Sequence, residues 1–454
     1  MNPLLGPWLE IAVAIPALLA GPVSLIRDKR LALRVCTVGC GLAFAAAFLA
    51  WLAQYSGTGP GTGPVFRIDE LSAPLLPAIA LLHLLMSLTT SNWKAESFGA
   101  ARYSLSLSLR LAVFATSDPW LLVGLSAACC VPPFFDLKHA KKPTALYLIH
   151  MLPFAAFLAG GWALVENGNP DSGAILLILA VLIRSGVFPA HVWILDLIEN
   201  GSFSSAVLMV TPMLGVYLAV RLAIPVAPAW LLTTVTIVSL GTALYSSAMA
   251  VVQTESRRFF AHLFVSFSSL VLVGLEVQTR ISVTGALALW FSVMISAGGL
   301  TVALRAVEAR HGRLSLRIHH GLYHRSPLLA IGFLMTGLAC VGFPGTIGFV
   351  SAELLIDGTL ESNLWIGIAI IVVTGLNGIA VMRAYWAIFT GSRHVGATAL
   401  PVTWPERSAI LVFAVVIFGG GLFPQPWLTS RYEASRAVIG TPSAGDESGI
   451  AGGE

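Results

Sequence analysis

The chain has 454 residues, of which 56% are hydrophobic and only 11% are charged, and its formal net charge is +4. Soluble domains carry about 25% charged residues, so this composition excludes a soluble globular protein. It predicts an all-α polytopic membrane protein, because repeated apolar segments of about 20 residues are long enough to cross a bilayer as helices.

The apolar segments predict about fourteen membrane helices when a window of about 20 residues is moved along the chain. In chain order they cover residues 7–26, 32–54, 70–90, 103–117, 119–136, 143–165, 172–196, 203–225, 229–252, 258–276, 281–306, 326–359, 364–390 and 405–424. The seventh and twelfth are long, and we expect both to be broken, at Gly186 with Pro189 and at Gly342 to Gly345.

The broken seventh segment also carries charge. Arg184, His191 and Asp196 lie within one run that ends an otherwise apolar stretch. In hydrocarbon a helix break exposes backbone groups and a charge is costly, so both persist only where they line a polar interior. The run therefore predicts an ion or proton path inside the bundle.

Basic residues gather in alternate loops, which predicts the orientation of the chain. The loops assigned to the inner side hold Arg27, Lys29, Arg30, Lys94, Arg102, Lys138, Lys141, Lys142, Arg257, Arg258, Arg310, Arg313, Arg317, Arg325 and Arg393. This places both termini outside. The inner loop 307–325 is basic and rich in histidine, and is either a solvated loop or a docking face for a cytoplasmic partner.

The two breaks suggest an internal inverted repeat, as in many ion-coupled transporters. Residues 1–90 would form three N-terminal helices. Residues 103–225 (spans 4–8) and 229–390 (spans 9–13) would form the two five-helix repeats, followed by a last helix at 405–424. Residues 429–454 are rich in Ser, Gly, Ala and Glu, and we expect a disordered tail there.

The sequence offers no catalytic or cofactor motif. The five cysteines lie in apolar stretches without metal-ligand spacing and are expected to be packing residues. A phosphate loop, a dinucleotide fingerprint and a catalytic triad are absent from the sequence. We therefore expect no cofactor, no metal and no nucleic-acid partner, and any chemistry would belong to a partner subunit.

Several motifs, in order along residues 65–395, resemble those of a known family. Gly186-Val-Phe-Pro-Ala-His-Val-Trp193 with Asp196 is similar to the seventh-helix motif of the antiporter-like subunits of respiratory complex I and of Mrp cation/proton antiporters. The further matches are Phe66-Arg-Ile-Asp-Glu-Leu-Ser72, Val216-Tyr-Leu-Ala-Val-Arg221, Thr254-Glu-Ser-Arg-Arg-Phe-Phe-Ala261, Gly342-Phe-Pro344 and Gly348-Phe-Val-Ser351. The twelfth-helix forms look nearest the L-type branch, which includes the membrane subunits of DAB-type inorganic-carbon transporters.

The resemblance implies a proton-translocating, or cation/proton-translocating, subunit of a larger complex-I-like or Mrp-like assembly in the inner (plasma) membrane. Its partners would be other membrane and peripheral subunits, together with membrane lipid. One alternative is a membrane subunit of an inorganic-carbon (bicarbonate or CO2) uptake complex driven by the proton gradient. A second is a degenerate, non-conducting structural anchor.

The chain departs from the family at several titratable positions. Aligned on the motifs, the fifth-helix glutamate falls on Ala127 and the seventh-helix lysine on Arg184. The eighth-helix position falls among Met209, Thr211 and Met213, and the twelfth-helix lysine on Ala352, beside Glu353. Burial can bring the pKa of a lysine toward neutrality, but arginine stays protonated, so Arg184 suits a fixed charge better than a proton carrier.

The candidates for an ion or proton path are the ionisable residues within the predicted spans, each with a structural alternative. Arg184 could instead pair with Asp196, Arg383 could form a structural salt bridge, Asp357 could be solvated, and the histidines could be packing residues. The candidates are Arg110, Arg184, His191, Asp196, His262, Glu353, Asp357 and Arg383.

Overall fold

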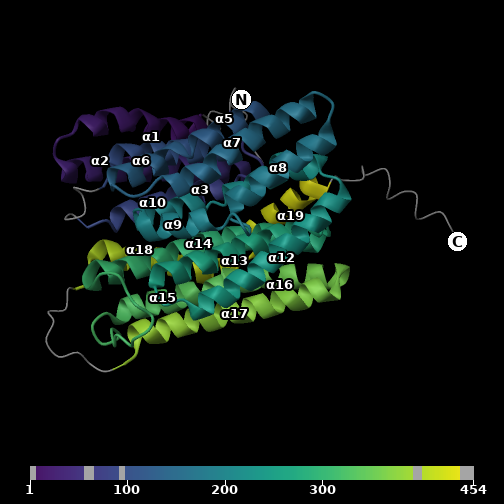
Figure 1. Ribbon diagram of the computed structural model, residues 1–454. Coiled ribbons are helices and arrows are strands. Elements are labelled where there is room, and N and C mark those ends of the chain that lie inside the picture. Colours follow the sequence, from purple (N-terminus) through teal and green to yellow (C-terminus); the bar gives the residue numbers. More distant parts are fainter. Residues whose placement is uncertain (1–6, 56–65, 92–97, 392–400, 440–454) are drawn as a thin grey trace.

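The computed structural model describes residues 7–55, 66–91, 98–391 and 401–439. In these residues the regular secondary structure is helical and includes no β-strand, although Glu255 and Ser315 form an isolated bridge. The helices run side by side along one direction (Figure 1), with the N-terminal half of the chain on one side and α15 to α17 on the other. Lys94, Arg393 and the tail 440–454 lie outside the described residues.

The helix bounds follow the predicted spans closely, with several spans divided. They are α1 (Trp8–Leu25), α2 (Lys29–Tyr55), α3 (Leu75–Leu88), α4 (Ala100–Ala115), α5 (Pro119–Ala128), α6 (Val131–His139), α7 (Ala145–Glu166), α8 (Pro170–Ser185), α9 (Val192–Asn200), α10 (Phe203–Val210), α11 (Leu214–Leu218), α12 (Ala229–Val252), α13 (Ser256–Glu276), α14 (Arg280–His311), α15 (Pro327–Cys340), α16 (Ile347–Ser362), α17 (Leu364–Phe389), α18 (Trp404–Leu422) and α19 (Gln425–Ile439).

Among the described residues, 10 helical segments are long and apolar enough to cross a membrane. Shorter apolar helices, including α3 and α15, lie beside them. The prediction of an all-helical, multi-pass membrane protein is therefore confirmed.

The break after α8 is built from a glycine. Gly186 takes a left-handed conformation with φ of 72° and caps the helix, its N–H donating to the Ile183 carbonyl oxygen. The left-handed conformation favours glycine at this position, and a Cβ would also displace the end of the Ile194 side chain. Beyond it, the Phe188 N–H donates to the Thr242 hydroxyl on α12 at 3.1 Å, which satisfies a backbone group that lipid could not.

The break between α15 and α16 is also built from glycines in the left-handed conformation. Gly342 and Gly345 have φ of 81° and 83°. The start of α16 also lies directly against the end of α15, because a Cβ at Gly348 would overlap the Ala339 carbonyl oxygen. This break thus needs two glycines for backbone conformation and a third for close approach.

A further break divides the predicted helix 203–225, which we expected to be continuous. Pro212 and Met213 separate α10 from α11, and Met213 has φ of 49°, unusual for a residue with a side chain. The Pro212 carbonyl oxygen accepts the Trp290 indole N–H from α14 at 3.0 Å. After α11 the chain continues as a π-helix, Ala219–Ala223, and a short 3₁₀ turn.

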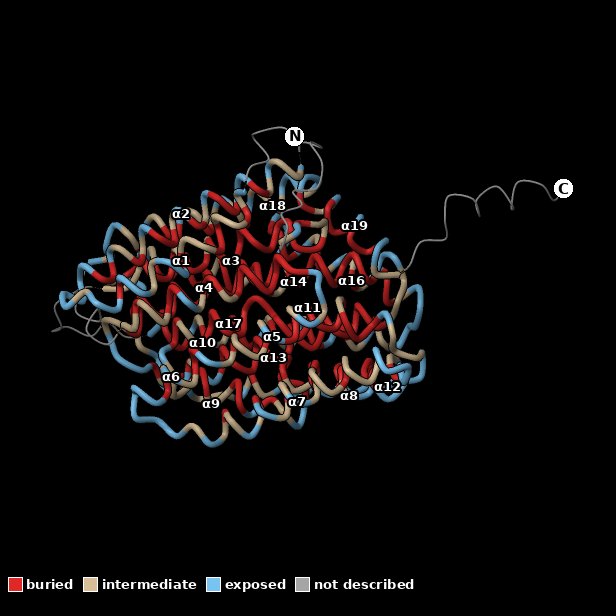
Figure 2. The backbone as a smooth tube through the Cα atoms, turned by 90° about the horizontal axis from the view of Figure 1, so that it is seen from above, coloured by how far each residue is buried: buried red, intermediate tan, exposed pale blue. Residues whose placement is uncertain are grey.

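Helices α13 and α14 form the centre of the molecule. The apolar stretch of each is buried within the chain along its whole length, whereas only 22–28% of the corresponding stretches of α1, α7 and α18 is buried. Figure 2 shows buried backbone concentrated in the middle of the bundle and exposed backbone around its rim. The inner helices can therefore carry polar groups that lipid never contacts.

The prediction of a disordered tail from residue 429 is wrong for its first part, which is helical. Residues 425–439 form α19, so α18 is not the last helix. Arg431 is fully buried and donates to the backbone oxygens of Glu70 and Leu71, and burial lowers its pKa to about 10. Composition missed α19 because its anchor is a contact with the segment before α3, 360 residues earlier in the chain.

Candidate functional site

Arg184 lies at the last turn of α8, with 4% of its surface exposed. Its Nη2 donates to the Met209 carbonyl oxygen at 3.0 Å, and its Cζ lies 5.2 Å from the centre of the Trp193 ring. The alternative of an ion pair with Asp196 is wrong for the structure as described. Asp196 is half-buried and instead accepts from the Asn200 amide at 2.8 Å.

Arg110 is buried in α4, and one of its partners, His83, is a buried ionisable residue that the sequence analysis missed. Its Nη1 lies 3.4 Å from His83 Nε2, and it also donates to the Ser106 hydroxyl and carbonyl oxygens. His83 Nδ1 is 2.9 Å from the Ile79 carbonyl oxygen. The only hint in the sequence was a lone histidine in an apolar span, which is more often a hydrogen-bonded packing residue.

The structure brings Arg110 and Arg184 together at one small cavity. Both line a space of about 10 Å³, enclosed further by Cys129, Met209 and other apolar side chains. The sequence gave no reason to expect two predicted candidates, from the fourth and seventh predicted spans, at the same place.

His191 and His262 are also brought together. Their ring centres are 6.3 Å apart, and the Tyr245 ring lies 5.5 Å from His191 and 6.2 Å from His262. Both histidines are buried, and Phe188 from the helix break stacks on His191 at 5.6 Å. Histidine is the side chain whose unperturbed pKa lies nearest neutrality, so this cluster is suited to exchanging protons.

From this cluster a row of polar side chains follows the contact between α12 and α13. On α13 it comprises His262, Ser266, Ser269 and Glu276, spaced so that all four share one helix face. Glu276 is buried and lies beside the Thr236 hydroxyl on α12. We call these residues, with Thr236, Ser239 and Ser246 of α12, the α12–α13 polar row.

Helix α17 extends the polar row, because Asn377 donates to the Ser266 hydroxyl at 3.0 Å. On a different face of α13, Ser268 donates to the Ser185 carbonyl oxygen at 3.3 Å, beside the α8 break. The sequence analysis missed Glu276 because it stands at the end of a predicted span, where a carboxylate is normally solvated. Helical spacing from His262 would have pointed to the shared face.

Many polar atoms of the row have no protein partner. Among the described residues, the buried atoms without one include His191 Nδ1, Ser239 Oγ, Ser246 Oγ, His262 Nδ1, Ser269 Oγ, Glu276 Oε2 and Asn377 Oδ1. Buried polar groups are normally hydrogen-bonded, and water commonly serves where protein does not. This concentration along one helix contact marks a place suited to a chain of water molecules.

The remaining candidates lie elsewhere. Glu353 and Asp357 are exposed on α16, so this chain does not enclose them. Arg383 is half-buried and donates to the carbonyl oxygens of Val251 and Gln253 at 2.6 and 2.8 Å. It thus caps the end of α12 through carbonyls, and the salt bridge that we expected as its structural role is not what the structure shows.

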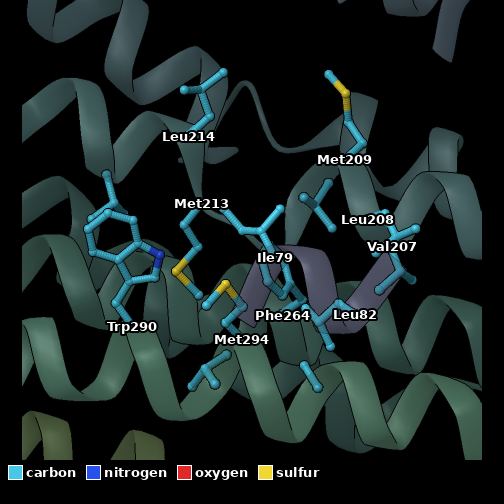
Figure 3. Close-up of a cluster of buried hydrophobic side chains, with 14 of the residues drawn as sticks. Ile79, Leu82, Val207, Leu208, Met209, Met213, Leu214, Phe264, Trp290 and Met294 are labelled. Carbon is cyan, nitrogen blue, oxygen red and sulfur yellow. The ribbon is translucent and has the colours of Figure 1, made fainter. Parts of the chain in front are cut away.

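The centre of the molecule, where α10 and α11 meet α14 and α3, is filled by apolar side chains. Figure 3 shows Met213 and Met294 with their sulfur atoms turned toward each other, beside Trp290, Ile79 and Phe264. These residues are all buried. The polar row and the Arg110–Arg184 cavity are therefore separate sites, with apolar packing across the middle of the bundle.

The fold defines a multi-pass helical membrane protein, and comparisons with known proteins show which proteins it resembles. A family model described as "NADH:quinone oxidoreductase/Mrp antiporter, TM" matches residues 163–377. The F(420)H(2) dehydrogenase subunit M of Methanosarcina mazei is 24% identical over 417 residues, covering 82% of this chain and 83% of that subunit. These matches confirm the predicted resemblance to the antiporter-like subunits of complex I and Mrp antiporters.

Two solved structures share the fold. A chain of respiratory complex I from Thermus thermophilus with bound NADH is 20% identical, with a TM-score of 0.83 over 95% of this chain and 99% of that one. A chain of the Mrp complex from Dietzia sp. DQ12-45-1b is 20% identical, with a TM-score of 0.84 over 97% of this chain and 98% of that one. The expected nearness to the L-type branch stays a prediction.

Proposed function

We propose that the chain is a proton-translocating, or cation/proton-translocating, subunit of a larger assembly in the inner membrane, with other membrane and peripheral subunits as partners. Its similarity to that family supports this proposal, and the structurally similar chains come from multi-subunit complexes. The proposal includes about fourteen crossings, both termini outside, and two inverted repeats at 103–225 and 229–390. The glycine-rich breaks at α8–α9 and α15–α16 support the repeat.

The observation that carries the proposal is the α12–α13 polar row. His262 and Glu276 are 14 residues apart on α13, which at 1.5 Å per residue is about 21 Å. A bilayer's hydrocarbon core is about 30 Å thick, so the row covers most of that depth. Burying polar atoms without partners is energetically costly, so a line of such atoms in an apolar interior supports a functional role.

The chemistry of the row fits proton transfer. His191 and His262 can take a proton at one end, serine and threonine hydroxyls both donate and accept hydrogen bonds, and Glu276 can receive the proton at the other end. Arg184 keeps its proton in almost any environment, so in this proposal it acts through its fixed charge. The row takes the place of the predicted path through Glu353, which lies on the outer surface of the chain.

The test is flux through the assembled complex in membrane vesicles, measured together with the yield of the complex. We expect Glu276→Gln to lower flux at least about tenfold with normal yield, because the amide keeps the size and hydrogen bonding of the carboxyl group but cannot titrate. We expect His262→Phe to lower flux as well.

Glu353→Gln is the matched comparison, and we expect it to keep most of the flux. Loss of flux in Glu353→Gln with normal flux in Glu276→Gln would move the path to α16. Normal flux in Glu276→Gln, His191→Phe and Glu353→Gln together would contradict conduction by this chain. The apolar packing shown in Figure 3 favours a structural anchor in that event. Membership in an inorganic-carbon uptake complex remains a further proposal, for which the identity of copurifying subunits is the test.

A further inference from the structure

The cavity between α4 and α8 is lined by two guanidinium groups. Arg110 and Arg184 are 5% and 4% exposed, so both charges are removed from solvent. The cavity measures about 10 Å³, close to the space that one water molecule needs. The rest of its lining carries no charge and consists of Val113, Phe114, Cys129, Met209, Pro212 and Leu214.

Every hydrogen-bond partner that the structure shows for the two guanidinium groups is neutral. Arg184 binds a backbone carbonyl, and Arg110 binds a hydroxyl, a carbonyl and a histidine ring. His83 holds a proton on Nδ1, because that atom faces the Ile79 carbonyl oxygen. Its Nε2 therefore accepts from Arg110, and the ring is neutral.

The two positive charges also lack a carboxylate. Within the part of the chain that the structure describes, the ion pairs include neither Arg110 nor Arg184, and Arg184 Nε is buried without any hydrogen-bond partner. A buried lysine could lose its proton, but arginine does not, so deprotonation cannot remove the charge. Two like charges lining one buried cavity are unfavourable unless a negative charge joins them.

We propose that this cavity binds one small monovalent anion of the size of chloride, held between the guanidinium groups of Arg110 and Arg184. The cavity's small volume favours a single-atom anion such as a halide over a larger polyatomic anion, and the unpartnered Arg184 Nε–H supplies a donor. The anion replaces the missing carboxylate and links Arg110 of α4 to Arg184 of α8. The site does not depend on whether the chain conducts protons.

The first test is thermal unfolding of the purified full-length chain, or of its complex, at constant ionic strength in sodium chloride, sodium bromide or sodium gluconate. Gluconate is too large for the cavity. We expect chloride and bromide to raise the unfolding temperature by about 2 °C or more relative to gluconate, saturating with concentration. In Arg110→Met this difference should vanish. An equal unfolding temperature in all three salts would overturn the proposal.

A second variant keeps the test decisive if Arg110→Met does not fold. Cys129→Asp places a carboxylate in the cavity itself, so we expect a protein that is stable in gluconate and gains nothing from chloride. Cys340→Asp is the matched control, because Cys340 is a buried cysteine at a different cavity, lined without arginine. It should lower stability in every salt. A chloride response in Cys129→Asp as large as in the parent protein would show that the anion binds elsewhere and would overturn the proposal.

Discussion

The surroundings of a side chain determine how much it contributes to stability. Two adjacent arginines at the start of α13 illustrate this. Arg257 forms a two-pronged pair with Glu308, with distances of 2.8 to 3.2 Å, and lies 5.0 Å from the Phe203 ring. The Glu308 side chain is only 4% exposed and also accepts from Ser256. Arg258 pairs with Glu199 at 2.7 Å, but its own side chain is 53% exposed.

We therefore expect different effects from the same substitution at neighbouring positions. Arg257→Met should destabilise the protein by roughly 3–5 kcal/mol, because it leaves the Glu308 charge buried without its partner. Arg258→Met should cost at most about 1 kcal/mol, because water screens an exposed pair. Unfolding temperatures of the two variants in the same detergent give the comparison. Equal losses would mean that burial of Glu308 does not control the energetics.

At the scale of helices, glycines set where the chain can break and how closely helices approach. The α15–α16 break brings the start of one helix against the backbone of the other, with Gly348 over the Ala339 carbonyl. Gly378, in the middle of α17, meets nothing within 4 Å in the direction of a side chain. A side chain at Gly348 would therefore collide with backbone, whereas one at Gly378 would have free space.

Gly348→Ala should fold poorly, because its methyl group has to displace backbone atoms, which are far less able to move than a side chain. Gly378→Ala should fold at least as well as the parent protein, since alanine is favoured over glycine in a helix by about 1 kcal/mol. Yield of monodisperse protein and its unfolding temperature distinguish the two. Normal yield for Gly348→Ala would show that the break can rearrange.

At the scale of the whole molecule, segments from the two ends of the chain meet. α19 returns to the segment before α3, where Arg431 and Ser430 bind the Glu70 carbonyl oxygen. Close by, Arg221 pairs with Asp69 at 2.6 Å. Although burial acts to raise the pKa of Asp69, the Arg221 guanidinium and the Ser72 hydrogen bonds hold it below its ordinary value. The C-terminal helix therefore belongs to the packed protein.

The proposed topology predicts the compartment of the chain's C-terminal end. About fourteen crossings, an even number, place both termini on the outer side, in keeping with the basic residues of alternate loops. A reporter fused after α19, active only outside the cytoplasm, should give a positive result, and the same reporter inserted into loop 307–325 should give none. A cytoplasmic C-terminus would remove one crossing and with it the inverted repeat.

The sequence by itself determined the class of protein and two of the places where its helices break, at Gly186 and Gly342, but it did not predict the break at Pro212 and Met213. Membrane insertion follows from composition because each apolar residue adds its own transfer free energy, whatever its neighbours do. The breaks at Gly186 and Gly342 follow from local backbone geometry, since glycine accepts a positive φ and proline lacks an N–H. Family motifs such as Gly186 to Trp193 could also be recognised in the sequence, because they are short and contiguous.

Only the tertiary structure decided which polar residues meet. Arg110 with Arg184, His191 with His262, and Arg431 with Leu71 are pairs of residues far apart in the chain. A hydropathy profile contains no term for such contacts. The sequence could not predict side-chain exposure either. Glu353 and Glu276 both lie in apolar helices, yet Glu353 is exposed and Glu276 is buried. In a protein apolar on nearly every face, amphipathic pattern cannot tell lipid from protein interior, so only the packing of one helix against another assigns each face.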